Sequence, residues 1–335
     1  MAIRLPLCLV ALAALLAGLA LDTPAAPPEN ESVKLLIAFS SFRERKLHPK
    51  VYFYEHDGVG DGKIVGSIDA VNQRSDYHPS LSHDGRFCAF ASELENQTGR
   101  IQLWDVRDKK LVELAAAVND SPNGQMGPGL SGDGKWLAFS AWNRPGVGPR
   151  WDLLLYDVAA KKLAELPGVN TAEFDERMPA LSADGRFLAY ATNSRKGVGL
   201  TDVFLFDRQE KKLDLLPAMN SKSMDVEPSL SGDGNLVAFV SDRPGGKGGR
   251  DVYLYDCAAA KFLPLPGLNS AADEQTPCLS ADGRFLVFVS QRIGGEGERD
   301  IYLYDRKAEK LLPTPGLNSK AEDFDPCVIV LQGKE

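Results

Sequence analysis

The segment PCLSADGRFLVFVSQRIGGEGERDIYLYD, residues 277–305, contains the pattern on which this chain is built. It holds an apolar segment, a Ser-x-Asp-Gly tetrad, a second apolar segment, a Gly-rich loop and an alternating segment closed by an acid. Alternating aromatic and β-branched residues are typical of strands. An Asp-Gly pair between two such segments favours a tight hairpin, because glycine tolerates a positive φ. Residues 277–305 therefore predict three consecutive antiparallel strands.

The same pattern recurs along the chain at a nearly constant spacing. The tetrads have their aspartates at Asp84, Asp133, Asp184, Asp233 and Asp282, which are 49, 51, 49 and 49 residues apart. A short fourth apolar segment follows the alternating one, as in KKLAELPGVN at residues 161–170. Repeated units of about 50 residues with four short strands predict a β-propeller. A tandem row of separate small domains is disfavoured, because one unit alone would bury too little apolar surface.

The two ends of the repeat array predict the number of blades. Residues 34–43, KLLIAFSSFR, match the second strand of a unit, and no first strand precedes them. Residues 325–330, DPCVIV, match a first strand without its successors. Joining the two ends completes a sixth unit and leaves no open sheet edge. We therefore predict an all-β, six-bladed propeller of four-stranded blades over residues 34–331, closed by the C-terminal strand, with residues 332–335 as a tail.

The first 21 residues predict an export signal. Arg4 is followed by an almost continuous apolar run from Leu5 to Leu21, with small residues near its end. An uncleaved membrane anchor is the alternative, but the run is short for a span and contains Pro6. Residues 22–33 read as a flexible linker. We expect a secreted or periplasmic protein of the bacterial cell envelope, without a stable membrane span after cleavage.

Composition narrows the classes of partner. The formal net charge of −8 and the pI near 5.2 disfavour a nucleic-acid partner. Four cysteines follow the predicted signal, and none has the spacing of a metal or redox motif. Disulfides are permitted in an exported chain, but small core thiols are the favoured reading. These cysteines are Cys88, Cys257, Cys278 and Cys327.

At residues 280–290, SADGRFLVFVS, and 300–305, DIYLYD, the sequence resembles the TolB-type propeller repeat, also called the WD40-like PD40 repeat. The resemblance covers residues 34–330 and implies a TolB-like propeller. TolB itself carries an additional N-terminal α/β domain, for which this sequence has no room before Lys34. Related propellers occur in tricorn-type and prolyl-oligopeptidase-type proteases, fused to catalytic domains. The family's Ser-Pro-Asp-Gly tetrad has its proline replaced here, by His83, Gly132, Ala183, Gly232 and Ala281.

A binding site is predicted at one mouth of the channel. The residue three positions before the proline of each unit is a carboxylate in five of six units, and is Gln125 in the other. Propeller symmetry would bring these carboxylates into a ring that suits cations or basic side chains and raises some of their pKa values. The alternative is that each acid accepts N–H bonds from its own loop. We call these residues the acid ring: Asp76, Glu176, Asp225, Glu274 and Asp323.

The Gly-rich loops between second and third strands should lie at the same mouth. Their arginines could contact an acidic partner, although pairing with Asp202, Asp251 and Asp300 is the favoured prediction. Trp142 and Trp151 lie in one of these loops, and an exposed tryptophan favours a partner contact. The arginines are Arg43, Arg144, Arg195, Arg243 and Arg292.

The sequence predicts no catalytic residue, no metal site and no cofactor. It has no Gly-x-Ser-x-Gly elbow, no His-Glu-x-x-His and no phosphate loop. Its four histidines, His48, His56, His78 and His83, are expected on different faces, which argues against a shared site. The leading prediction is a monomeric, exported, non-enzymatic propeller that binds a protein or peptide partner, with basic groups favoured. The alternatives are a carboxylate-based hydrolase or lyase acting on a glycan or other polymer, and a purely structural surface protein.

Overall fold

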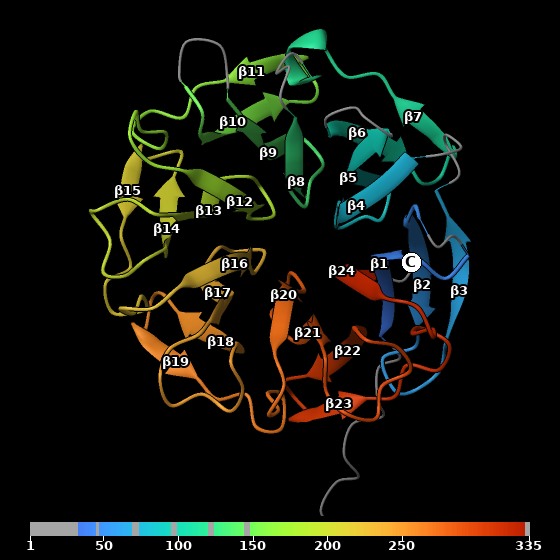
Figure 1. Ribbon diagram of the computed structural model, residues 1–335. Helices are drawn as coiled ribbons and strands as arrows, with labels where there is room; N and C mark the ends of the chain where they lie inside the picture. Colours follow the sequence, from blue (N-terminus) through green and yellow to red (C-terminus); the bar gives the residue numbers. More distant parts are fainter. Residues whose placement is uncertain are drawn as a thin grey trace, which may run out of the picture. The chain divides into compact units, whose positions relative to one another are not determined.

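The computed structural model describes residues 33–44, 47–68, 74–94, 99–119, 124–143 and 148–331. All the described elements lie in one compact unit, Ser32–Glu335. This unit is a ring of six four-stranded antiparallel sheets (Figure 1). The predicted six-bladed propeller is therefore confirmed, whereas the predicted signal peptide lies outside the described residues. No helix among those residues is long and apolar enough to cross a membrane.

In each blade the first strand lies nearest the centre of the ring and the fourth lies outermost (Figure 1). A short 3-10 turn, η1 (Ala116–Asn119), precedes the third blade. The strands, blade by blade, are β24 (Asp323–Leu331), β1 (Lys34–Ser41), β2 (Lys50–His56) and β3 (Gly62–Ser67); β4 (Arg74–Leu81), β5 (Phe87–Leu94), β6 (Arg100–Asp105) and β7 (Lys110–Val112); β8 (Gln125–Leu130), β9 (Trp136–Trp142), β10 (Trp151–Asp157) and β11 (Lys162–Ala164); β12 (Glu176–Leu181), β13 (Phe187–Thr192), β14 (Asp202–Asp207) and β15 (Lys212–Asp214); β16 (Asp225–Leu230), β17 (Leu236–Ser241), β18 (Asp251–Asp256) and β19 (Lys261–Leu263); β20 (Glu274–Leu279), β21 (Phe285–Ser290), β22 (Asp300–Asp305) and β23 (Lys310–Leu312).

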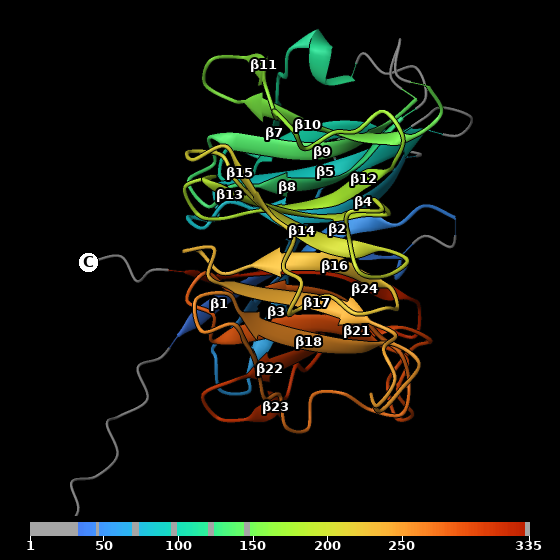
Figure 2. The ribbon, with the colours of Figure 1, turned by 90° about the vertical axis from the view of Figure 1, so that its left-hand side faces the viewer.

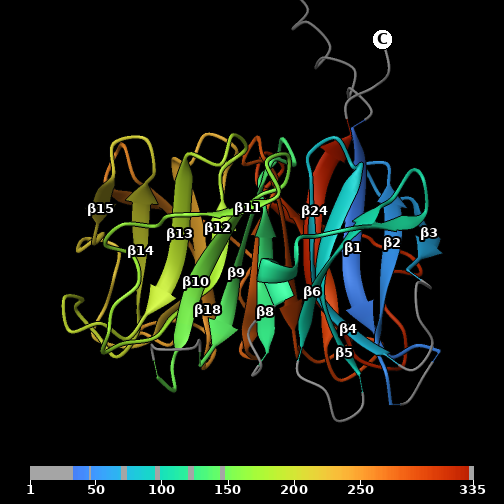
Figure 3. The ribbon, with the colours of Figure 1, turned by 90° about the horizontal axis from the view of Figure 1, so that it is seen from above.

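The first blade joins the two ends of the strand array. β24 pairs antiparallel with β1, so that Val330 lies opposite Leu35 and Cys327 lies opposite Ala38. The end of β24 and the start of β1 lie at the same end of the ring (Figure 3). The predicted closure by the C-terminal strand is confirmed.

The core lies between the blades. Seen from the side, the strands of neighbouring blades run from one end of the ring to the other (Figure 2). Six clusters of buried side chains each combine residues of two neighbouring blades. A second strand is covered on both of its faces, and all six residues of β21 are accordingly buried. This two-sided burial explains the unbroken apolar runs that follow the Asp-Gly turns.

The Ser-x-Asp-Gly tetrads form tight turns between first and second strands. Ser82 Oγ donates to Asp84 Oδ1 at 2.6 Å and accepts the N–H of Phe87 at 2.9 Å. Gly85 has a φ of 69°, which glycine adopts without strain. The same bonds recur in the other four tetrads. We call the end of the ring that carries these turns the turn end.

The tips of the five turns bind one another around the turn end. His83 N–H donates to the Gly132 carbonyl, Ala183 N–H to the Gly232 carbonyl and Gly232 N–H to the Ala281 carbonyl, each at 2.8 Å. Proline has no N–H, so these bonds account for its replacement at His83, Ala183 and Gly232. The opposite end, which we call the crossover end, carries the Gly-rich loops and the connections between blades.

The cysteines of the described chain are all free thiols. Cys327 Sγ accepts the N–H of Leu81, and Cys278 Sγ accepts the N–H of Val328, each at 3.4 Å across a blade boundary. Ser80 occupies the same strand position and accepts the N–H of Leu130 at 2.9 Å. These two thiols therefore serve as weak acceptors that join neighbouring blades.

Candidate binding site in the central channel

All five members of the acid ring are buried at the crossover ends of the first strands. Glu176, Asp225, Glu274 and Asp323 are the first residues of their strands, and Asp76 is the third residue of β4. Gln125, the exception in the sequence, is also buried at the start of β8. The structure thus brings the acids to one end of the ring, as the sequence predicts, but turns them away from solvent.

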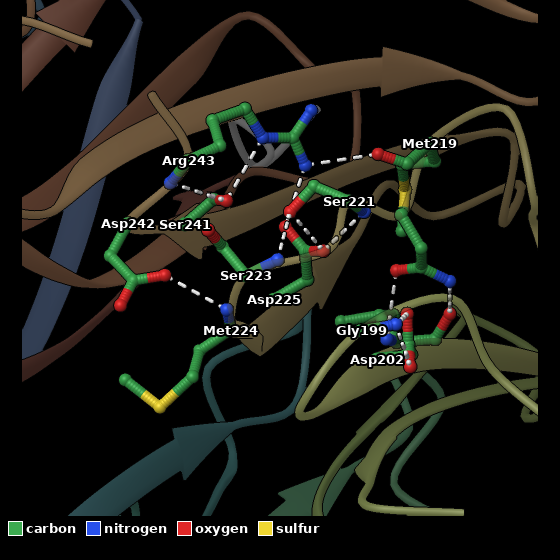
Figure 4. A network of polar contacts seen from close by, with 12 residues as sticks. Gly199, Asp202, Met219, Ser221, Ser223, Met224, Asp225, Ser241, Asp242 and Arg243 are labelled. Atoms are coloured by element: carbon green, nitrogen blue, oxygen red, sulfur yellow. Dashed lines mark hydrogen bonds and ion pairs between the residues drawn. The ribbon is translucent and has the colours of Figure 1, made fainter. Parts of the chain in front are cut away.

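Asp225 illustrates how a ring acid is held (Figure 4). It accepts the N–H of Ser221 at 2.6 Å and the hydroxyl of Ser221 at 2.9 Å. Arg243 Nη2 donates to the same carboxylate at 2.6 Å and to the Met219 carbonyl at 2.9 Å. The guanidinium also lies over the ring of Tyr253, 4.6 Å from its centroid. The acid and the arginine together fix the loops at the crossover end.

Two other ring acids are held in the same way. Arg43 Nη2 lies 2.8 Å from Asp323, and Arg292 Nη2 lies 3.1 Å from Glu274. All three arginines are mostly buried, and their charges are cancelled by the carboxylates. These arginines therefore belong to the scaffold of the crossover end.

Glu176 differs from these three acids. Ser194 stands at the position that Arg243 occupies one blade later, and no cation of the described chain forms an ion pair with Glu176. Its carboxylate accepts the N–H of Thr171 at 3.1 Å and the Thr171 hydroxyl at 2.9 Å. Burial raises the pKa of Glu176 to about 7.

Arg243 and Arg292 pair with ring acids and not with Asp251 and Asp300, so the prediction is wrong for these two arginines. Asp202 instead accepts the N–H groups of Val198 and Gly199 at 3.1 Å and 3.2 Å. Asp251 accepts the N–H of Lys247 at 2.9 Å. These aspartates are already occupied by the backbone of the Gly-rich loops, which leaves the ring acids as partners for arginine.

Three further residues were predicted as possible partner contacts: Arg195, Arg144 and Trp142. Arg195 is exposed on its loop, whereas Arg144 lies outside the described residues. Trp142 is half-buried against Trp151, with ring centroids 5.4 Å apart.

A second ring lies two residues further along the same strands. Every first strand has a β-bulge there, at which a residue and the proline after it have no partner on the second strand. The bulge suits proline, which has no N–H to donate. The residue before each of these prolines has a φ between 45° and 57°, a backbone region that residues other than glycine rarely adopt. We call these residues the girdle: His78, Gly127, Met178, Glu227, Thr276 and Asp325.

The girdle lines a cavity of about 320 Å³ in the channel. No two of its members are the same residue, although the backbone repeats in all six blades. Following the blades, Asp325 is succeeded by His78, Gly127, Met178, Glu227 and Thr276. Polar side chains therefore fill one arc of the girdle, and small or apolar ones fill the other.

The polar side chains of this arc bond to one another or to the backbone, but not all of their hydrogen-bonding groups have partners. His78 Nδ1 lies 3.0 Å from Asp325 Oδ2, and Glu227 Oε2 accepts the N–H of Thr276 at 2.6 Å. Thr276 Oγ1 is buried without a hydrogen-bond partner in the described structure. Burial, followed by the Asp325 charge, raises the pKa of Glu227. Burial alone would lower the pKa of His78, but the Asp325 carboxylate outweighs it and raises that pKa.

The sequence did not identify the girdle, although it contained a signal. The residue before each repeated proline is the variable one, and only the bulge turns it toward the channel. His78, in the girdle, and His83, at a turn tip, both line this cavity. That the histidines form no shared catalytic or metal site stays a prediction. His56 is buried at the end of β2, and His48 Nδ1 lies 3.1 Å from Ser75 Oγ.

No protein-family model and no curated protein matches this sequence. Many solved structures resemble it, and three of them illustrate the likeness. The TolB structure from Acinetobacter baumannii is 18% identical, with a TM-score of 0.63, over 88% of this chain and 66% of that chain. The structure of a putative TolB from Agrobacterium tumefaciens is 16% identical, with a TM-score of 0.55, over 90% of this chain and 100% of that chain. A prolyl endopeptidase structure is 15% identical, with a TM-score of 0.50, over 86% of this chain and 44% of that chain.

The chain thus spans just under two thirds of the length of the Acinetobacter baumannii TolB structure. At these identities the likeness concerns the fold alone. Together with the six blades, it shows that the chain has a TolB-like propeller fold, as the sequence motif predicts.

Proposed function

We propose that this TolB-like propeller is an exported, non-enzymatic module that binds a protein or peptide partner in the cell envelope. The observation that carries the proposal is the girdle, where one repeated backbone geometry presents six different side chains to a cavity. If these residues only stabilised their own blades, the six blades would be expected to carry similar residues at this position.

The Gly-rich loops at the crossover end supply an apolar surface for such a partner. Leu47, Val198, Leu200 and Ile293 are exposed on the loops of the first, fourth and sixth blades. Exposed apolar side chains on such loops can take part in a protein contact. In this proposal the acid ring positions these loops and does not itself touch the partner.

The alternative, a carboxylate-based hydrolase or lyase, would need an accessible acid with a pKa near neutrality. Among the acid ring, Glu176 has such a pKa, but only 1% of the residue is exposed. Its oxygens are also occupied by Thr171. A substrate at the mouth would not reach it, which supports a non-enzymatic role.

The test is capture of partners from the native envelope fraction by the chain without its predicted signal peptide. The double variant Leu200→Glu/Ile293→Glu places charge on the crossover loops. Val59→Glu is the matched control, because Val59 is equally an exposed apolar residue but lies in the β2–β3 turn at the opposite end. We expect the wild type and Val59→Glu to capture the same partner and the double variant to lose it. Equal capture by all three folded proteins would refute the proposal.

A further inference from the structure

The size of the girdle cavity limits what can occupy it. Its volume of about 320 Å³ is at the lower end of the range of about 300–1,000 Å³ seen for small-molecule sites. The occupant is therefore a single side chain or a small molecule.

The Glu227 side of the girdle offers a hydrogen-bond acceptor. Glu227 uses Oε2 for the N–H of Thr276, whereas its Oε1 has no protein partner in the described parts of the chain. Asp325, by contrast, has His78 at 3.0 Å. Glu227 is thus the girdle carboxylate without an ion pair in the described chain, although Arg250 and His78 act on it at longer range.

The opposite arc is apolar and has room. Met126 and Met178 line the cavity, and 37% of each residue is exposed. Flexible thioether side chains adapt their shape to an aliphatic group. Gly127 lies between them with nothing within 4 Å of the position where a Cβ would be. A chain of methylenes can therefore lie along this wall.

A positive charge also lines the cavity, on the blade that carries Met178. Arg177 belongs to the lining and forms no ion pair within the described chain. Its guanidinium would repel a second cation that entered beside the first. The cavity is thus suited to one cation, held on the Glu227 side.

We infer that the girdle binds one alkylammonium group, the side chain of a lysine carried by the partner. The ammonium donates to Glu227 Oε1, and its methylenes pack on Met126 and Met178. This inference rests on the proposed function and names the chemistry that its site recognises.

Isothermal titration calorimetry with the chain lacking its predicted signal peptide tests the inference. The probes are Nα-acetyl-lysine amide, its uncharged analogue Nα-acetyl-norleucine amide and free n-butylamine. We expect the lysine probe to bind at least about tenfold more tightly than the norleucine probe. Glu227→Gln should weaken the lysine probe by about tenfold. Arg177→Gln removes a like charge from the cavity lining and should increase the affinity for the lysine probe.

Three outcomes would overturn the inference. One is equal binding of the lysine and norleucine probes, or no effect of Glu227→Gln in a folded variant. Another is loss of binding in Arg177→Gln together with binding of Nα-acetyl-glutamate amide, which would identify an anion site. The third is n-butylamine binding more tightly than the lysine probe, which would assign a free amine. If Glu227→Gln still captures the envelope partner but Leu200→Glu/Ile293→Glu does not, the proposed function stands and the lysine inference fails.

Discussion

The acid ring and the girdle lie two residues apart on the same six strands, yet they follow opposite rules. The acid ring repeats one chemical group in five blades and buries it. Four of these acids bond to loop residues, and Asp76 accepts a bond from Ser92 of β5. The girdle repeats a backbone conformation in six blades and varies every side chain. A side chain that each blade needs for its own loop is repeated. A side chain that faces a common cavity is free to differ, and in the proposed function these differences reflect the partner that the cavity binds.

The largest expected effect separates the two rings by stability. Asp225→Ala leaves the mostly buried Arg243 guanidinium without its carboxylate, so we expect a loss of about 3–5 kcal/mol in the free energy of unfolding. Glu227→Ala removes a carboxylate that the fold does not neutralise, together with one bond to Thr276, and should cost about 1 kcal/mol or less. Urea denaturation of both variants measures this. Similar losses in the free energy of unfolding for the two variants would show that the acid ring and the girdle do not differ in their contribution to stability.

The contrast also explains what could be predicted from sequence. The turn tetrads and the offset ends of the array were enough for six blades and for closure, because both depend on local signals and on counting. The position of the acid ring followed from the same repeat. Its burial did not, because the pairing of Arg243 with Asp225 instead of Asp251 depends on how two loops from one blade fold together.

The girdle could not be predicted for a different reason. Whether Glu227 points to the channel depends on a register shift between β16 and β17, which separates Val226 from Ser229. A regular strand would have placed the side chain on another face, because side chains alternate along a strand. The repeated proline after a variable residue was the available signal. This signal can be interpreted only when the position of the bulge is known.

A smaller effect tests whether the positive φ of the girdle residues costs stability. Gly127 has a φ of 57° and open space where a Cβ would lie, so Gly127→Ala should cost about 1 kcal/mol through the backbone alone. Met178 has the same φ, and Met178→Gly should stabilise the fold by up to about 1 kcal/mol. Urea denaturation with unchanged m values measures both. A loss above about 2 kcal/mol for Met178→Gly would instead place Met178 in the core.

The smallest effect distinguishes members of the acid ring by pH. Burial raises the pKa of Glu176 in the folded state to about 7, above its unfolded value. The protonated acid is therefore favoured by folding, and the stability that this contributes is present at acid pH and is lost as the pH rises toward and through 7. Allowing for solvent screening, we expect a loss on the order of 1 kcal/mol between pH 5 and pH 8.

Glu176→Gln carries no charge at either pH, so it should show a smaller loss of stability than the wild type across the same interval. Glu274→Gln is the matched comparison, because it deprives Arg292 of its carboxylate and should destabilise the fold at both pH values. Thermal unfolding at pH 5 and pH 8 measures all three proteins. If Glu176→Gln retained the full pH dependence of the wild type, another group would be its source. Glu176 would then be held like its neighbours, and the lack of an arginine in the fourth blade would have no energetic consequence.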